Sequence, residues 1–181
     1  MKGFRWVLLA LAAVAAVPLL LLAVLWSLPR PHPESPLAAG VDPDLKDDGP
    51  NGWTPLMHAV HKGQEAAVAR LLAAGAHPDA VSRNGTTALL LAAGQGETAI
   101  VRRLLAAGAH PRLASRFGAT ALTNAVANGS AGAVHALLAA DPGLRLGSGI
   151  PDRLARLLAR LRGDAEILAL VDPARRAEGR S

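Results

Sequence analysis

The stretch GWTPLMHAV, residues 52–60, decides the fold because the chain repeats it twice more at a fixed interval. GTTALLLAA begins at Gly85 and GATALTNAV begins at Gly118, so the three segments follow one another every 33 residues without a gap. The segment LLAAGAHPDA from Leu71 recurs in the same register as LLAAGAHPRL from Leu104. A period of this length is typical of a solenoid in which each repeat is one supersecondary unit.

The residue types inside each repeat predict two helices. Thr54, Thr87 and Thr120 stand where the first helix needs an N-cap, because a threonine hydroxyl accepts a hydrogen bond from a free backbone N–H group. Pro55 follows at the first helical position, where its missing N–H is tolerated. Leucine and alanine recur on one face of the first helix, and valine recurs in the second: Leu56, Leu89, Leu122, Ala59, Ala92, Ala125, Val68, Val101 and Val134.

Glycines mark the ends of these helices. Gly63, Gly96 and Gly129 fall at the turn between the two helices of a repeat. Gly75 and Gly108 end the second helix, and the spacing to the next repeat leaves room for one β-hairpin. Aromatic residues make up only 3% of the chain, so the apolar positions are small or aliphatic and favour an all-α fold.

The repeats resemble the ankyrin repeat, whose sequence runs roughly G-x-T-P-L-H-x-A-A and continues through a Gly to a second helix ending in L-L. The resemblance implies two antiparallel helices and a protruding β-hairpin per repeat, stacked into a curved solenoid. It also implies that a protein partner is held by the hairpin tips and the exposed end of each first helix. Carried over position by position, the expected binding surface comprises Asp48, Asn51, Trp53, His61, Val81, Arg83, Asn84, Thr86, Arg116 and Phe117.

The chain departs from the family pattern at the histidine of T-P-L-H. Met57, Leu90 and Thr123 occupy that position, which in the family ties the hairpin to the helix. His58 lies one place later, and we do not expect it to substitute. Hairpin order should then depend more on neighbouring contacts.

The ankyrin-repeat domain is expected over residues 40–171. The repeats are 52–84, 85–117 and 118–149, between a degenerate N-terminal cap at 40–51 and a degenerate helical C-terminal cap at 150–171. In the C-terminal cap, IPDRLARLLARL and GDAEILALV predict two further helices. Arginines alternate there with leucines, which favours a solvated outer face; a surface for phosphate or lipid headgroups is the alternative. Residues 172–181 are predicted to be a disordered tail.

The first thirty residues contain an uncharged run from Trp6 to Leu28, 23 residues in length. As a helix this run measures about 34 Å, enough to span a hydrocarbon core of about 30 Å. A secretory signal has an apolar stretch of only about 7 to 15 residues. We therefore predict a transmembrane signal-anchor helix within residues 1–29, followed by a Pro-rich linker at 30–39.

Charges around this run predict its orientation. Lys2 and Arg5 precede it, whereas Arg30 alone follows it, so the N-terminus should be cytoplasmic and the repeat domain periplasmic. The expected location is a single pass through the inner (plasma) membrane of a bacterium, because the chain is rich in alanine and arginine. A cytoplasmic repeat domain, and a cleaved and secreted one, remain the alternatives.

Other chemistry is poorly represented. The net charge of +5 comes from dispersed arginines without interleaved aromatic residues, so nucleic-acid binding is not expected. The chain has no cysteine, which removes disulfides and thiolate catalysis. The pairs His58 with His61 and His77 with His110 lack a third metal ligand. We expect no cofactor, no metal, no small-molecule substrate and no catalytic residue, and a monomer.

The sequence therefore predicts a membrane-anchored, non-catalytic protein–protein interaction module, acting as an adaptor or scaffold. The identity of the protein partner is not encoded in the fold. Two alternatives stay open: an inhibitor or immunity-type protein that blocks an exported enzyme, and an accessory to a periplasmic stress enzyme such as a catalase.

Overall fold

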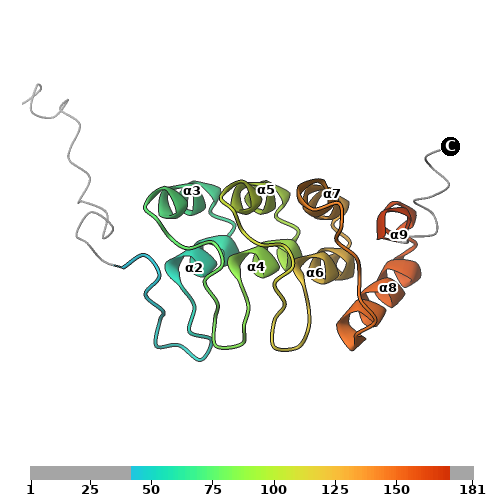
Figure 1. Ribbon diagram of the computed structural model, residues 1–181, viewed down its shortest axis with the longest axis horizontal. Coiled ribbons are helices and arrows are strands. Elements are labelled where there is room, and N and C mark those ends of the chain that lie inside the picture. Colours follow the sequence, from blue (N-terminus) through green and yellow to red (C-terminus); the bar gives the residue numbers. More distant parts are fainter. Residues whose placement is uncertain (1–41, 172–181) are drawn as a thin grey trace, which may run out of the picture. The chain divides into compact units, whose positions relative to one another are not determined.

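The computed structural model describes residues 42–171, and the secondary structure over that range is helical. The helices follow one another in pairs: α2 (Pro55–His61) with α3 (Glu65–Ala73), α4 (Ala88–Gln95) with α5 (Thr98–Ala106), α6 (Ala121–Asn128) with α7 (Ala131–Ala140), and α8 (Ile150–Arg162) with α9 (Ala165–Val171). Figure 1 shows α2, α4 and α6 in one layer, α3, α5 and α7 in a second, and the connecting loops projecting to one side. The predicted all-α fold of stacked helix pairs is confirmed.

In the three predicted repeats, the first helix (α2, α4 or α6) begins directly after the predicted threonine. The Oγ1 atom of Thr54 accepts a hydrogen bond from the backbone N–H of Met57 at 3.4 Å, and that of Thr87 from Leu90 at 3.3 Å. In the third repeat, Thr120 Oγ1 accepts from the backbone N–H of Thr123, and Thr123 Oγ1 accepts in return from the backbone N–H of Thr120. The caps satisfy backbone donors that would otherwise be buried without a partner.

Small side chains allow neighbouring helix pairs to approach closely. Ala92 in α4 and Ala125 in α6 have no exposed surface, and these two helices pack directly against each other. The same stacking joins α2 to α4 and α6 to α8. Leu89 and Leu104 are also fully buried, and each such side chain contributes about 1.5–3 kcal/mol when it leaves water. Because the core runs between pairs, it is one continuous layer through the array.

The connecting loops differ from the predicted β-hairpins. Residues 42–171 contain no strand; the loop before α6 has one isolated bridge, between Ala114 and Thr120. Two backbone bonds close each loop. Ser82 N donates to Thr86 O and Ser115 N to Ala119 O, both at 2.9 Å, and inside them Gly85 N donates to Ser82 O at 3.0 Å and Gly118 N to Ser115 O at 2.9 Å. The threonine cap starts the helix immediately afterwards, so too few residues remain to form a ladder.

The two ends of the array have different structures. At the N-terminal end, Asp47 N donates to Trp53 O at 2.9 Å, the same closing bond as in the later loops, so this segment is equivalent to the loops before α4 and α6. At the C-terminal end, α8 packs on α6 and α9 packs on α7, as a fourth pair. The two helices predicted for the C-terminal cap are therefore present.

The predicted membrane anchor at 6–28, the linker at 30–39 and the tail at 172–181 lie outside the described residues. Within residues 42–171, no helix combines the length and apolar character needed to cross a bilayer.

Replacing the buried cap Thr87 by alanine should lower the free energy of unfolding by about 1 kcal/mol, because the N–H of Leu90 loses its partner. Chemical denaturation of the full chain, followed by circular dichroism, measures this loss. The matched control is Thr86→Ala, which removes the same group one residue earlier, where it caps no helix. Equal midpoints for the two variants would contradict the assigned cap.

Candidate functional site

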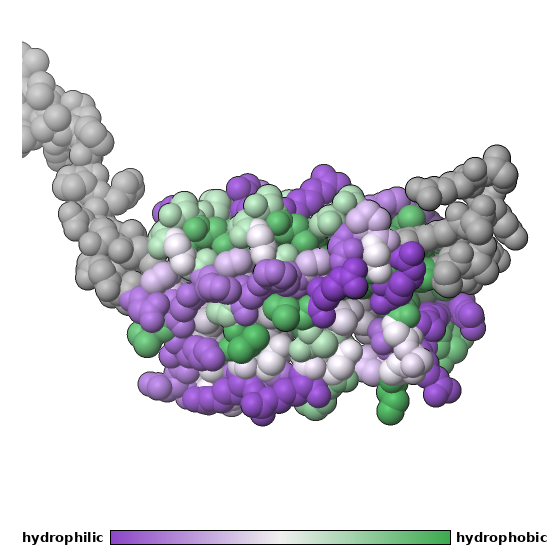
Figure 2. Space-filling view, viewed as in Figure 1, coloured by the Kyte–Doolittle hydropathy of each residue, from purple (hydrophilic) through white to green (hydrophobic). Residues whose placement is uncertain are grey.

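The loops before α2, α4 and α6 are joined into one continuous edge. Arg83 N donates to Asn51 O at 2.9 Å, and one repeat later Arg116 N donates to Asn84 O at 3.1 Å. Each loop tip is thus hydrogen-bonded to the tip before it. Figure 2 shows hydrophilic residues gathered along the edge from which the loops project.

Glycine makes this close approach possible. Gly85 has φ +72°, and a Cβ atom there would lie 3.2 Å from the backbone nitrogen of Arg116. A side chain at that position would therefore strain its own backbone and push the next loop away. Gly118 has the same conformation, but a Cβ there would meet nothing within 4 Å. The contrast arises because the loop that follows α7, residues 141–149, does not approach Gly118.

A second row of contacts joins the loops nearer their start. The Asp44 carboxylate accepts from His77 N at 3.0 and 3.1 Å, and Asp79 accepts from His110 N at 2.9 Å and also pairs with its ring. These two aspartates begin equivalent loops, so each carboxylate reaches the loop of the next repeat.

The third junction reverses the charges of this row. Arg112 stands where the earlier loops have aspartate, and it donates to Asp141 through Nε at 2.6 Å and Nη2 at 2.9 Å. This hydrogen bond lowers the pKa of Asp141 and raises the pKa of Arg112. Because the Arg112 side chain is largely exposed, the pair contributes more to the register of the loops than to stability.

The structure places most of the predicted binding residues on the surface. Eight of them are exposed, whereas Trp53 and Thr86 are half-buried. Backbone bonds bring four of the exposed ones together at the loop tips: Asn51, Arg83, Asn84 and Arg116. Phe117 adjoins them and is 76% exposed. The remaining exposed ones are Asp48, His61 and Val81.

Two arginines of this edge have different environments. Arg83 Nη1 donates to Gly49 O, and its side chain covers Gly52, where a Cβ would come within 3.0 Å of Arg83 Cγ. Arg83 is therefore partly structural. Arg116 forms no side-chain hydrogen bond or ion pair with the described part of the chain, so its guanidinium is available to a partner.

Trp53 packs on its own repeat. Its ring contacts the edges of His58 and His61, with ring centroids 5.3 and 5.0 Å apart. Asp47 joins the same cluster, because one carboxylate oxygen accepts from Trp53 N at 2.9 Å and the other lies 2.7 Å from His58 Nε2. The indole is therefore fixed in orientation and only partly available to a partner.

The expectation that His58 does not tie the loop to the helix was wrong. Asp47 makes the loop-closing backbone bond that Ser82 makes in the next repeat. The side chain of Asp47 is longer than that of Ser82 and reaches His58, one place beyond the family histidine position. At the family histidine position itself, Met57 is fully buried, whereas Thr123 donates to Asp152 Oδ1 of α8 at 2.5 Å. Asp152 was not among the predicted residues, and its sequence signal is a carboxylate in the first turn of a helix.

The histidines considered as metal ligands lie in separate environments. His58 pairs with Asp47, and Gln95 Nε2 lies 3.1 Å from His61 Nδ1. His77 N donates to the Asp44 carboxylate and His77 Nδ1 accepts from Asp79 N at 3.2 Å, whereas the His110 ring pairs with the Asp79 carboxylate. Across residues 42–171, no group of three or more potential ligands is arranged to hold a metal ion.

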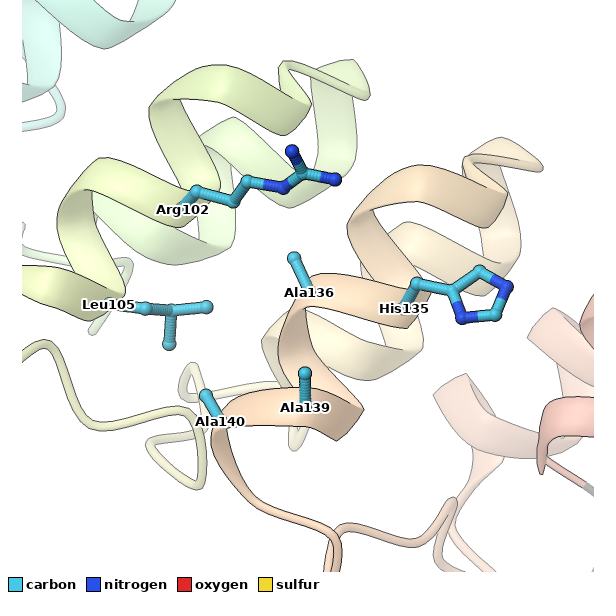
Figure 3. A pocket seen from close by; sticks show the side chains of 6 residues that line it. All are labelled: Arg102, Leu105, His135, Ala136, Ala139 and Ala140. Atoms are coloured by element: carbon cyan, nitrogen blue, oxygen red, sulfur yellow. The ribbon is translucent and has the colours of Figure 1, made fainter.

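A shallow hollow lies in the second layer, between α5 and α7 (Figure 3). Arg102 and Leu105 of α5 line it with His135, Ala136, Ala139 and Ala140 of α7. Arg102 extends towards α7, whereas His135 points away, where its Nε2 lies 3.1 Å from Glu166 Oε1. Alanine dominates the lining, so the hollow offers few groups that could orient a small ligand.

Stacked helix pairs with hydrogen-bonded loops define a helical repeat protein that presents one extended edge. A family model described as ankyrin repeats (3 copies) matches residues 34–113 and again residues 67–146, together more than half of the chain. The chain therefore belongs to the ankyrin-repeat family, and its repeats form a protein–protein interaction module. No curated protein matches it.

Acidification should loosen the first loop. The hydrogen bond from His58 lowers the pKa of Asp47 below its ordinary value of 3.8. The stabilisation from this carboxylate is present above that ordinary value and is lost as the pH falls through the lowered pKa. The indole NMR resonance of Trp53, followed from about pH 6 to about pH 2, should report the transition. Asp47→Asn should abolish it, and Asp48→Asn, the neighbouring control, should preserve it; a transition unchanged by Asp47→Asn would contradict this assignment.

Proposed function

We propose that this protein is a membrane-anchored, non-catalytic module that holds one protein partner on its loop edge, comprising Asn51, Arg83, Asn84, Arg116 and Phe117. The observation that carries the proposal is the hydrogen bonding of each loop tip to the next. It holds the exposed side chains in a row before a partner arrives, so little entropy is lost on binding.

The side chains on this edge are of the types that anchor protein interfaces. Arginine and aromatic residues are enriched at interfaces and carry much of the binding energy. The Arg116 side chain forms no hydrogen bond or ion pair with residues 42–171, and Phe117 is 76% exposed. Trp53 is a secondary contact because His58 and His61 already cover part of it.

A binding role without catalysis agrees with the chemistry of the described surface. General acid–base catalysis requires a titratable group poised beside a bound substrate. Within residues 42–171, His58, His110 and His135 are each paired with a carboxylate, and these pairs lie on separate repeats. We therefore propose that the module acts by binding its partner and catalyses no reaction itself.

Membrane anchoring is proposed from the sequence. The uncharged run from Trp6 to Leu28 is long enough to span a bilayer, and the basic residues Lys2 and Arg5 favour a cytoplasmic N-terminus. The module would then face the periplasm and be concentrated at the membrane, where a weak interaction becomes effective.

The double variant Arg116→Ala, Phe117→Ala should lose the partner in a pull-down after crosslinking in membranes, with mass spectrometry as the readout. Both side chains are exposed, so folding should be preserved. The control is Arg70→Ala, Arg102→Ala, which removes two exposed arginines from the second layer and should retain the partner. Equal recovery with both variants would refute the loop edge. If the recovered partner is an enzyme, its activity with and without the module separates an adaptor from an inhibitor or an accessory protein.

A C-terminal alkaline phosphatase fusion should be active, because this enzyme folds only after export. A stable but inactive fusion would contradict the periplasmic orientation. The mass of the same fusion, which should still include Met1 or Lys2, decides whether the apolar segment is kept.

A further inference from the structure

The outer face of α8 carries a row of exposed aliphatic side chains, here called the α8 stripe. Ile150, Leu154, Leu157 and Leu161 are 80%, 52%, 50% and 75% exposed. Most of the large apolar side chains in the first three repeats are buried, so this exposure needs an explanation. Figure 2 shows hydrophobic surface at the end of the array where α8 lies.

The α8 stripe lies opposite the face by which the helix joins the array. Ala155 and Ala159 have no exposed surface, and α8 packs on α6. At about 100° per residue, Ala159 lies about 140° around the helix from Leu154 and about 160° from Leu161. The stripe therefore faces outward, in the direction in which a further repeat would stack. A terminal repeat that only protected the core would carry a polar outer face.

The spacing within the stripe matches a helix partner. Its members follow one another at intervals of four, three and four residues. Spacings that alternate between three and four residues are those of the apolar positions in a coiled-coil seam. They suit packing against a second helix at a small crossing angle.

The charges beside the stripe are positive and unneutralised. Arg153 and Arg160 flank it on one side, and neither forms an ion pair or side-chain hydrogen bond with the described residues. The single carboxylate of α8, Asp152, is buried and accepts a hydrogen bond from Thr123. The acidic residues that follow α8 within the described range are engaged: Arg162 donates to Asp164, and Glu166 pairs with His135.

We propose that the α8 stripe is a second interaction surface, which binds an amphipathic helix with acidic flanks from a partner protein. The partner helix packs its apolar side chains between those of the stripe, as α6 packs on α4, and its carboxylates face Arg153 and Arg160. A second copy of this chain is a poor occupant, because an antiparallel copy would bring these arginines against their own equivalents. The surface is separate from the loop edge and does not depend on the function proposed above.

A pair of synthetic peptides tests the proposal with the full chain held in nanodiscs of zwitterionic lipid. Each peptide spans three heptads, about 21 residues, with leucine at the seam. One carries glutamate at the flanking positions and the other carries lysine. Fluorescence anisotropy should show the glutamate peptide binding at least about tenfold more tightly than the lysine peptide.

Substitutions then assign the binding to the stripe. The double variant Leu154→Gln, Leu157→Gln should weaken binding of the glutamate peptide by at least about tenfold, because it removes two leucines that the bound peptide would bury. The matched control is Leu45→Gln, at a 63% exposed leucine in the first loop, which should leave binding unchanged. Arg153→Glu with Arg160→Glu should reverse the preference between the two peptides. These positions are exposed, so circular dichroism should show folded variants.

Several results would overturn the proposal. One is equal binding of the two peptides, and another is absence of binding by either. Loss of binding in nanodiscs of anionic lipid would assign the stripe to the membrane surface. Self-association of the chain that the leucine substitutions abolish would assign it to a second copy. The variant Arg116→Ala, Phe117→Ala should leave peptide binding intact, so failure of the loop edge and failure of the α8 stripe are distinguishable.

Discussion

The close stacking of one helix pair on the next is the interaction on which the rest of this structure depends. A single pair has no core of its own, and the alanines at Ala92 and Ala125 let α4 and α6 approach until both residues lose all exposed surface. The loops follow from this stacking. Arg83 N reaches Asn51 O only because the helices beneath are in register, so the binding edge is a consequence of the core.

Contacts between repeats keep this register while the side chains change. The Asp44 carboxylate meets a backbone N–H of the next loop, whereas Arg112 meets the carboxylate of Asp141. Both arrangements join equivalent positions, so the attraction is preserved when the charges are exchanged. The array can therefore vary its exposed chemistry along the edge without losing the spacing of the loops, which suits a surface selected for one partner.

The 33-residue period was sufficient to predict the helices, the threonine caps and the turn glycines, because these depend on local sequence and its repetition. Contacts between distant residues were not predictable. Asp47 reaches His58, and Thr123 reaches Asp152, through tertiary packing that no spacing encodes. The exposure of Leu161 was missed for the same reason: alternating leucine and arginine suits a solvated cap until the packing of α8 on α6 shows which face is outward. Of the candidate site, the loop-tip residues lie on the surface, and Trp53 is half-buried because its indole packs against His58 and His61.

The loop edge, and not the second layer of helices, is the surface proposed to meet the partner. Photocrosslinking in cells from a benzoylphenylalanine at position 117 tests this contact. The substitution replaces one aromatic side chain by another, at a residue that is 76% exposed. The same group at Ala139, exposed on α7, serves as the comparison. A discrete crosslinked adduct is expected from position 117 and none from position 139. An adduct from position 139 with none from position 117 would contradict this proposal.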